Sequence, residues 1–190
     1  PTGTNISDKK DFPEDTEIID SVSEYKDIAG TSANSSKKLL TRATNLPDSV
    51  DNSQSIYFPE IGNQGHLLIS LPEDQKGVFK KYTAGHTVVY GRKTLETFPG
   101  QRLLPNRVNV IMSRSFDYEK EGAMVLHSVD ELEDFLELTA DEVYLIGGAS
   151  LYNSLIGLCD KAIITSIRAE FEADCWFPNL DEDPEWEMEE

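Results

Sequence analysis

Two segments of this sequence combine a β-branched run, glycine and a helix-forming run, a combination that can bind phosphate. They are Thr-Val-Val-Tyr-Gly-Arg-Lys-Thr-Leu-Glu at residues 87–96 and Val-Tyr-Leu-Ile-Gly-Gly-Ala-Ser-Leu-Tyr at residues 143–152. A strand that breaks at glycine and leads into a helix presents backbone N–H groups and the positive end of the helix dipole. For one junction, an ordinary βα turn is an equally good explanation. The pair, with Arg92 and Lys93 in the first helical turn, favours nucleotide binding.

The charge of the chain is unevenly distributed. The formal net charge is −18, yet residues 75–114 contain eight basic residues and one acid, a balance of +7. Residues 170–190 contain ten acids and no base. The overall charge argues against general binding to nucleic acid or membranes, whereas a cationic region within it attracts a small anion. Some of the lysines are equally explained as the solvated face of a helix.

The cysteines and the hydropathy narrow the class of protein further. Cys159 and Cys175 have no paired spacing to histidine, so we expect neither a metal site nor a disulfide framework. Free thiols favour a reducing compartment, and we expect a cytoplasmic protein. No apolar run approaches the ~20 residues that span a bilayer. A monomer is favoured.

Alternating strands and helices must position the two glycine junctions. The pattern predicts an α/β fold with a central, mostly parallel sheet and right-handed crossovers. Ser128, followed by Glu131 three residues later, is typical of a capped helix start. Ligands then bind at the carboxyl ends of the strands, where both junctions lie. We expect strands at residues 87–90, 107–113, 123–127, 141–146 and 161–169, and helices at residues 72–83, 92–98, 128–138 and 149–157.

Residues 1–55 differ in composition from the rest of the chain. Ser, Thr, Asn and Asp fill 26 of these 55 positions, so the segment has little apolar surface to bury. We therefore predict a polar extension, disordered or loosely docked, beside a domain formed by residues 56–190. Short helices are expected at residues 16–28 and 35–43.

Five segments between about residues 61 and 186 form an ordered set. They are Gly-Asn-Gln-Gly with Leu-Pro-Glu-Asp at residues 62–74, Val-Val-Tyr-Gly-Arg-Lys-Thr-Leu at residues 88–95, Leu-Pro-Asn-Arg-Val-Asn-Val-Ile-Met-Ser at residues 104–113, residues 143–152, and Ala-Asp-Cys-Trp-Phe-Pro at residues 173–178. In this order and with these spacings, the segments resemble the dihydrofolate reductase family. This resemblance implies a three-layer α/β fold and NADPH-dependent reduction of 7,8-dihydrofolate to tetrahydrofolate by hydride transfer, a step of one-carbon metabolism.

The resemblance implies a catalytic role for Asp74 and Thr165. Asp74 matches the carboxylate that accepts hydrogen bonds from the pterin N3 and 2-amino groups and favours protonation of the pterin. Thr165 matches the threonine that donates a hydrogen bond to this carboxylate. Without the resemblance, Asp74 reads as a first-turn helix acid and Thr165 as an ordinary β-branched strand residue.

The resemblance also implies a substrate pocket. Arg107 matches the arginine that binds the α-carboxylate of the glutamate tail, a role suited to its planar guanidinium group. Phe79 and Leu104 match residues that line the pterin and benzoyl groups, although each alone is as well explained as core. Ile69 stands where the family usually has tryptophan.

NADPH is the cofactor that the resemblance implies. Arg92, with Ser113 and Arg114, would bind the adenosine 2′-phosphate and so select NADPH over NADH. The residues matched to the cofactor site are Gly62, Asn63, Gly91, Arg92, Lys93, Thr94, Met112, Ser113, Arg114, Ile146, Gly147, Gly148, Ser150, Leu151 and Tyr152.

The sequence departs from the family pattern at two strands and at one insertion. Residues 50–60 do not alternate as the family's first strand does, and the family continues beyond Trp186 into a closing hairpin. The stretch from Asp74 to Gly91 is one residue longer than usual, which shifts Phe79 on its helix. We therefore expect an incomplete sheet, unless the extension supplies replacement strands. The alternative function is a truncated or fused reductase-like domain that binds nucleotide without turnover.

Overall fold

The computed structural model describes residues 19–27, 37–45, 60–67, 71–167 and 173–189. Eight strands of these residues form one sheet, in the order β11-β1-β9-β2-β8-β5-β6-β7, and three more form a small second sheet, β10-β3-β4. The strands of the large sheet are β1 (Ile19–Asp27), β2 (Lys37–Asn45), β5 (Thr87–Gly91), β6 (Val108–Met112), β7 (Met124–Leu126), β8 (Val143–Leu145), β9 (Lys161–Ile167) and β11 (Trp186–Met188). The small sheet contains β3 (Glu60–Asn63), β4 (His66–Leu67) and β10 (Cys175–Trp176).

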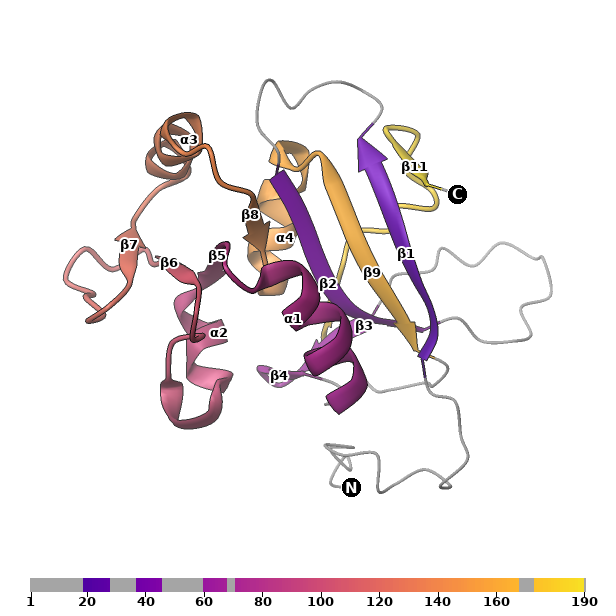
Figure 1. Cartoon of the computed structure of the whole chain (residues 1–190), viewed down its shortest axis with the longest axis horizontal. Helices are drawn as coiled ribbons and strands as arrows, with labels where there is room; N and C mark the ends of the chain where they lie inside the picture. Colours follow the sequence, from indigo (N-terminus) through magenta and orange to yellow (C-terminus); the bar gives the residue numbers. More distant parts are fainter. Residues whose placement is uncertain (1–18, 28–36, 46–59, 68–70, 168–172, 190) are drawn as a thin grey trace.

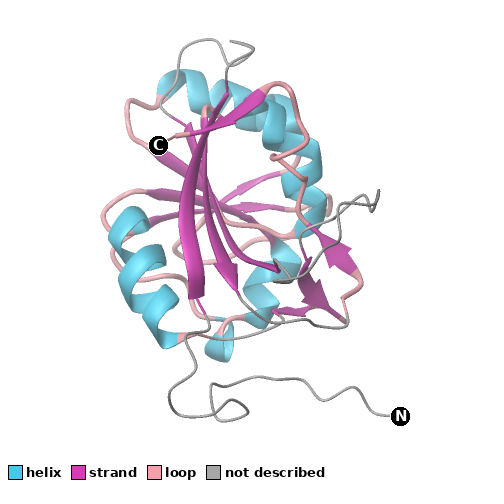
Figure 2. Ribbon diagram, turned by 90° about the vertical axis from the view of Figure 1, so that its right-hand side faces the viewer, coloured by secondary structure: helices cyan, strands magenta, loops and turns pink. Residues whose placement is uncertain are grey.

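The large sheet is mostly parallel, as the sequence predicted. Strands β9, β2, β8, β5, β6 and β7 run parallel to one another, and only β1 opposes its neighbours β9 and β11. Helices lie on both faces of the sheet, which makes the three layers seen in Figures 1 and 2. The helical elements are a π-helical turn η2 (Asp74–Phe79) continued by α1 (Lys80–Thr83), α2 (Arg92–Thr97), η3 (Pro99–Gln101), α3 (Val129–Leu138), α4 (Ala149–Leu155) and η4 (Ile156–Leu158).

Side-chain alternation along the strands separates two apolar cores. Val88 and Tyr90 on β5 point to the face covered by η2, α1 and α2, whereas Val89 between them points to the face covered by α3 and α4. All three side chains are buried. Because a strand has a side-chain period of two, a continuous apolar run such as residues 87–90 indicates a strand buried on both faces.

The predicted helix starts and strand positions in residues 72–167 match the structure within a few residues. At α3, the Ser128 side chain accepts a hydrogen bond from the Glu131 N–H at 3.1 Å, and the Glu131 carboxylate accepts one from the His127 N–H. The capping pattern is therefore confirmed. In the part of the chain that the structure describes, no helix is long and apolar enough to cross a membrane.

The predicted helices at residues 16–28 and 35–43 are wrong, because the described parts of both segments are strands. β1 pairs antiparallel with β9, and β2 lies between β8 and β9, parallel to both. From the sequence, one interior strand and the strands at one edge of the family's sheet were expected to be missing. These two positions are occupied by β2 and by β1 with β11. Residues of the polar extension thus supply replacement strands, and the limits of 1–55 as a separate unit remain a prediction.

Candidate active site

The buried pair Asp74 and Thr165 joins the start of the helix at residues 72–83 to strand β9. The Thr165 hydroxyl donates a hydrogen bond to Asp74 Oδ1 at 2.8 Å. Asp74 is only 4% exposed and Thr165 is completely buried. A buried carboxylate is costly unless it is hydrogen-bonded, so this contact fixes both the position and the orientation of the acid. The two residues assigned catalytic roles therefore meet, although 91 positions separate them.

The helix that carries Asp74 contains a π-helical turn. Hydrogen bonds of the α type flank this turn, from Gln75 N–H to the Leu71 carbonyl and from Ala84 N–H to the Lys80 carbonyl. Between them, the Lys80 N–H donates to the Gln75 carbonyl, five residues back. A π turn closes over one more residue than an α turn, so it accommodates an insertion without ending the helix. This geometry matches the extra residue noted between Asp74 and Gly91.

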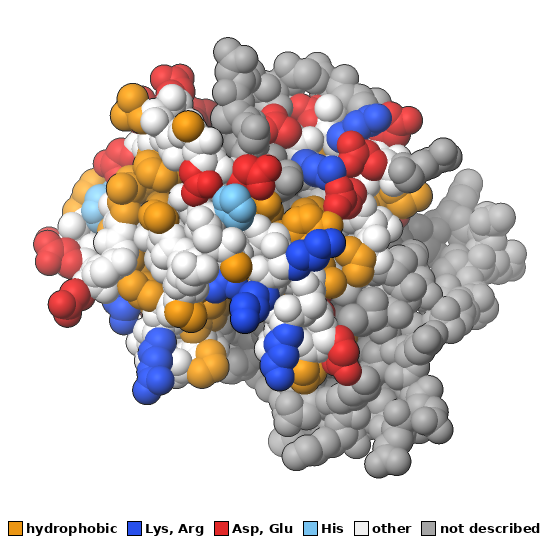
Figure 3. Space-filling view, in the orientation of Figure 1, with side chains coloured by type: hydrophobic (Ala, Val, Ile, Leu, Met, Phe, Trp, Pro, Cys, Tyr) orange, Lys and Arg blue, Asp and Glu red, His pale blue; other side chains and the backbone are white. Residues whose placement is uncertain are grey.

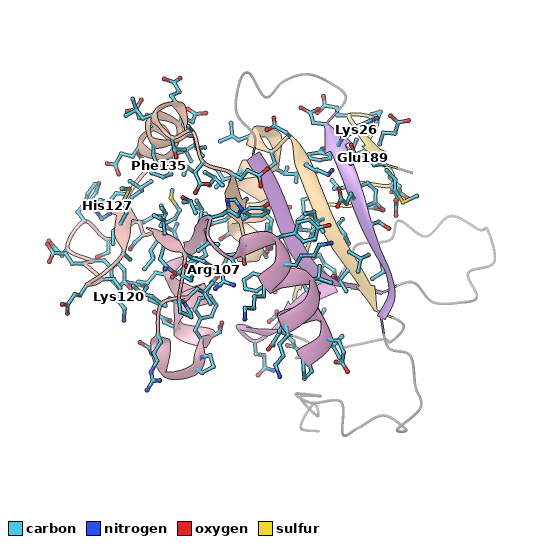
Figure 4. The ribbon with its side chains drawn as sticks, in the orientation of Figure 1. Lys26, Arg107, Lys120, His127, Phe135 and Glu189 are labelled. Atoms are coloured by element: carbon cyan, nitrogen blue, oxygen red, sulfur yellow. The ribbon has the colours of Figure 1, made fainter. Side chains whose placement is uncertain are left out.

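Arg107 lies at the other end of the same helix, next to α1 (Figure 4). Its Nε donates to the Thr83 hydroxyl at 2.8 Å, and its Nη1 donates to the Pro105 carbonyl at 2.8 Å. The guanidinium carbon is 5.5 Å from the centre of the Phe79 ring, a cation–π distance. Partial burial lowers the pKa of Arg107 from its ordinary value. Two predicted substrate residues, Arg107 and Phe79, are thus in contact.

Asn109 holds the loop that carries Leu104 through side-chain hydrogen bonds to its backbone. No role was predicted for Asn109 from the sequence. Its side chain accepts from the Leu104 N–H at 3.0 Å and donates to the Leu104 and Arg107 carbonyls. The hydroxyl of buried Tyr90 donates to the same Asn109 oxygen. An asparagine inside the apolar run Val-Asn-Val-Ile was the available signal, because a buried amide needs partners.

The two glycine junctions lie side by side, because β5 and β8 are neighbouring parallel strands. The Gly91 N–H donates to the Gly147 carbonyl at 2.8 Å, and the Ile146 N–H donates to the Val89 carbonyl at 2.9 Å. From β5 the chain goes to β6 and β7 on one side and then returns to β8 on the other. This reversal defines a topological switch point, where α/β sheets bind ligands.

Glycine is required at this point of the fold. Gly147 has φ +119°, and a Cβ there would lie 3.2 Å from the Tyr152 hydroxyl. The peptide bond between Gly147 and Gly148 is cis. A Cβ on Gly148 would lie 3.3 Å from Thr94 Oγ1, so α2 and α4 begin close together. Tyr152 and Leu151 both donate backbone hydrogen bonds to the Gly148 carbonyl, which starts α4.

The predicted second wall of the cofactor site adjoins the first junction. Met112 is the partner of Gly91 across β5 and β6, and buried Ser113 follows it. Arg114 and Lys93 are exposed. Arg92 forms an ion pair with Glu96 at 3.6 Å and stacks over the Tyr118 ring at 5.6 Å.

Basic side chains gather on one part of the molecular surface. Figure 3 shows most Lys and Arg side chains in the lower and middle part of this view, over the region of α1 and α2, and most acidic side chains in its upper half and along its left side. Lys80 and Lys81 of α1 and Arg92 and Lys93 of α2 belong to the basic residues counted in 75–114.

Gly62 and Asn63 lie in the small sheet. β3 and β4 form a hairpin whose turn residues Gln64 and Gly65 both have positive φ. Asp174 holds this hairpin, because its carboxylate accepts from the Gln64 N–H at 2.8 Å and its own N–H donates to the Gly62 carbonyl. The following strand β10 is joined to α4 through the bond from Asn153 to the Trp176 carbonyl. The predicted substrate residue Ile69 lies outside the described residues.

No group of three or more His, Cys, Asp and Glu side chains that could hold a metal ion occurs among the residues the structure describes. Cys159 and Cys175 are free thiols. Burial and the hydrogen bond to Asp174 raise the pKa of the Cys175 thiol to about 11.

A doubly wound α/β sheet with glycine junctions at its switch point, and a buried carboxylate bonded to a strand of that sheet, are typical of a nucleotide-dependent class of enzyme. The sequence model of the dihydrofolate reductase family matches residues 59–190. The chain belongs to the dihydrofolate reductase family.

Individual relatives agree with this assignment. The chain is 40% identical to dihydrofolate reductase of Bacillus subtilis over 124 residues, which cover 64% of this chain and 70% of the relative. It is 36% identical to the Haemophilus influenzae enzyme over 129 residues, which cover 68% and 77% of the two chains. Among solved structures, dihydrofolate reductase from Enterococcus faecalis complexed with NADP(H) and RAB-propyl superposes with a TM-score of 0.60 at 33% identity, covering 75% of this chain and 79% of that one.

Proposed function

We propose that the protein reduces 7,8-dihydrofolate to tetrahydrofolate with NADPH. The buried Asp74–Thr165 pair is the observation that carries this proposal, together with the two glycine junctions of the neighbouring strands β5 and β8 in the same sheet. A first-turn acid that served only the helix dipole would gain nothing from burial and from a threonine on a distant strand. The family assignment and the NADP(H) complex of the Enterococcus faecalis relative support the same reaction.

The residues at the two junctions fit a dinucleotide with a 2′-phosphate. A Cβ on Gly147 or Gly148 would lie 3.2–3.3 Å from a neighbouring side chain, whereas one on Gly91 would meet Leu151 at an ordinary 3.6 Å. Because these three glycines carry no Cβ, the phosphates of a ligand can approach the main chain closely. The basic side chains of Arg92, Lys93 and Arg114 supply positive charge for phosphate. The chemistry that NADPH brings to such a site is donation of a hydride to a ring carbon of the substrate.

Asp74 binds and orients the pteridine in this proposal. Its carboxylate accepts hydrogen bonds from the ring N3 and 2-amino groups, while Thr165 prevents the carboxylate from rotating away. The negative charge also favours protonation of the adjacent ring nitrogen, which makes the neighbouring carbon electrophilic.

Arg107 holds the opposite end of the substrate. Its Nε donates to the Thr83 hydroxyl and its Nη1 to the Pro105 carbonyl, and these two bonds hold the guanidinium plane, including Nη2, in one orientation. Such a preorganised guanidinium suits the glutamate carboxylate, because less rotamer entropy is lost on binding. In this proposal Phe79, whose ring contacts the Arg107 guanidinium, and Leu104 contact the pterin and benzoyl groups of the substrate.

The decisive experiment is turnover with NADPH and dihydrofolate, followed by the loss of absorbance at 340 nm. We expect turnover with NADPH, much less with NADH, and a loss of about 10²–10⁴-fold in kcat for Asp74→Asn. The matched control is Asp117→Asn, which changes an exposed carboxylate and should leave kcat unchanged. Saturable NADPH binding without turnover in the parent protein would instead establish the nucleotide-binding alternative.

The sequence-based expectations of a monomeric, cytoplasmic protein without nucleic-acid or membrane partners belong to the same proposal. Sedimentation of the purified protein with and without NADPH tests the oligomeric state directly.

A further inference from the structure

The helix at residues 72–83 is held at both ends by side chains from the sheet. At its start, Asp74 is bonded to Thr165 on β9. Near its end, the Tyr82 hydroxyl donates a hydrogen bond to Glu24 Oε1 at 2.6 Å. Glu24 lies on β1, outside residues 59–190 that match the family. A residue of the polar N-terminal segment therefore contacts the helix that carries the proposed catalytic acid.

Glu24 is itself held by charged neighbours. Its second carboxylate oxygen pairs with Lys161 Nζ, and Lys161 also pairs with Glu189 Oε2 at 2.5 Å. The Glu189 N–H donates to the Glu24 carbonyl, which fixes the chain after β11 against β1. Glu189 is labelled in Figure 4 near β1 and β11. One carboxylate thus connects β1, the helix and the first residue of β9.

Electrostatic interactions keep Tyr82 and Lys161 in one protonation state near neutral pH. The hydrogen bond to Glu24, together with burial, raises the pKa of Tyr82, so the phenol remains a donor. The contacts to Glu189 and Glu24 raise the pKa of Lys161, so the ammonium remains charged. A phenol that donates to a carboxylate forms a charge-assisted bond, which is shorter and stronger than a neutral one.

We propose that Glu24 is a positioning residue for the substrate site, acting through Tyr82. Since Tyr82 is two helical turns beyond Asp74, losing its anchor lets the helix rotate about the Asp74–Thr165 contact. Phe79 lies between these two anchors along the helix and Thr83 directly follows Tyr82. The Thr83 hydroxyl accepts a hydrogen bond from Arg107. Rotation of the helix therefore misplaces the pteridine and glutamate contacts together. This proposal rests on the proposed function.

A second ion pair on the same strand provides a matched control. Lys26 pairs with Glu187 on β11 at 3.4 Å, and both side chains are substantially exposed. Lys26 lies close to the end of β1 (Figure 4), and this pair joins β1 to β11 without involving the helix. A purely structural role for β1 would make Lys26→Met behave like the variants at Glu24.

The experiment compares Tyr82→Phe, Glu24→Ala, Glu24→Gln and the double variant Tyr82→Phe/Glu24→Ala with Lys26→Met. We expect Tyr82→Phe and Glu24→Ala each to raise KM for dihydrofolate roughly 10-fold, with KM for NADPH unchanged. The double variant should be no worse than Glu24→Ala alone, because Glu24→Ala already removes the contact that Tyr82→Phe removes. Glu24→Gln keeps an acceptor for Tyr82 and should retain most of the affinity. Lys26→Met should leave both KM values unchanged.

Amide hydrogen exchange of the parent and variants, without ligands, tests the same contact independently of turnover. Exchange in residues 75–83 should accelerate in Tyr82→Phe and not in Lys26→Met. Unchanged exchange and an unchanged KM for dihydrofolate would overturn the proposal, as would equal effects of Lys26→Met. An inactive parent with accelerated exchange in Tyr82→Phe would refute the proposed function while leaving the anchoring role of Glu24 intact.

Discussion

Asp141 joins the starts of the two neighbouring strands that end at the glycine junctions. Its Oδ2 accepts from both the N–H and the hydroxyl of Thr87 at 3.0 Å, and its Oδ1 is 2.9 Å from His86 Nδ1. Burial acts to raise the pKa of this carboxyl, but the hydrogen bonds from His86 and Thr87 outweigh it and lower the pKa below its ordinary value. The ionised form is therefore favoured in the folded protein.

This pKa shift predicts a contribution to stability that depends on pH. Because the folded-state pKa is the lower one, the contribution is present above the ordinary value of 3.8 and is lost as the pH falls through the folded-state pKa. Asp141→Asn should therefore lower Tm at pH 7, and its difference from the parent should shrink below about pH 4. Thermal unfolding of both proteins from pH 7 to pH 3 measures this, with Asp117→Asn as the control. A constant difference in Tm across this range would contradict the prediction.

Sequence motifs predicted several residues of the candidate site. They did not predict the residues that hold those side chains in position. Asp74, Thr165 and Arg107 were predicted as site residues because the sequence around them matches a known pattern, and their roles stay predictions. The structure brings Asp74 against Thr165 and Arg107 against Phe79. Asn109 lies in the matching segment at residues 104–113 but was given no role, and Glu24 lies outside the residues that match the family. The contact of Glu24 with Tyr82 and that of Asn109 with Tyr90 each join two separate elements, so neither follows from a local segment of sequence.

At the scale of elements, the π turn is the part of the helix that would accommodate the extra residue inferred between Asp74 and Gly91. Across this turn the helix keeps Asp74 against Thr165 and Phe79 against Arg107. Gly77 lies in this turn, is exposed, and has open space around it. A residue without packing partners is the natural one to remove.

Deleting Gly77 should convert the turn to a regular α-helix and leave both contacts in place. We expect KM for dihydrofolate to stay within about 3-fold of the parent and Tm not to fall, since the i→i+4 pattern is restored. The control is deletion of Lys81, which lies in the α-helical part and has no extra residue to lose. This deletion should displace Thr83 from Arg107 and raise KM for dihydrofolate. Equal loss of activity in the two deletions would show that the π turn does not absorb the insertion.

The elements between residues 72 and 167 were predictable because local periodicity and capping agree with their packing. A strand is predicted from composition alone by the β-branched and aromatic run Val88, Val89 and Tyr90. β1 was predicted as a helix because strand preference depends on context, and its partner β9 is remote in sequence. No local signal in residues 16–28 could have revealed that pairing.

On the scale of the whole molecule, the large sheet depends on two strands from outside the residues that match the family. β2 is interior, with hydrogen-bonded neighbours on both sides, whereas β1 lies near the edge. Removing an interior strand leaves backbone groups unpaired on two neighbouring strands and exposes apolar surface on both faces of the sheet. The free-energy cost of this exposure exceeds the typical free energy of unfolding of about 5–15 kcal/mol.

Truncations should therefore act in steps. Removing residues 1–18 keeps both strands and should leave cooperative unfolding and turnover intact. Removing residues 1–45 deletes β1 and β2 and should abolish both. Circular dichroism during heating and the 340 nm assay measure these outcomes. A cooperative, active protein after removal of residues 1–45 would show that the sheet does not need these strands.

The position of β2 also has a consequence for how the chain matures during synthesis. Lys37 pairs with Val143, and Lys38 with Lys161, so β2 leaves the ribosome about a hundred residues before either neighbour exists. The segment of β2 stays unpaired until these residues have been synthesised. Its pairing then joins residues far apart in sequence, and such non-local contacts slow folding. An exposed, waiting strand is also a site where chaperones bind or where nascent chains associate, so yield in cells should depend on translation speed and on chaperone supply.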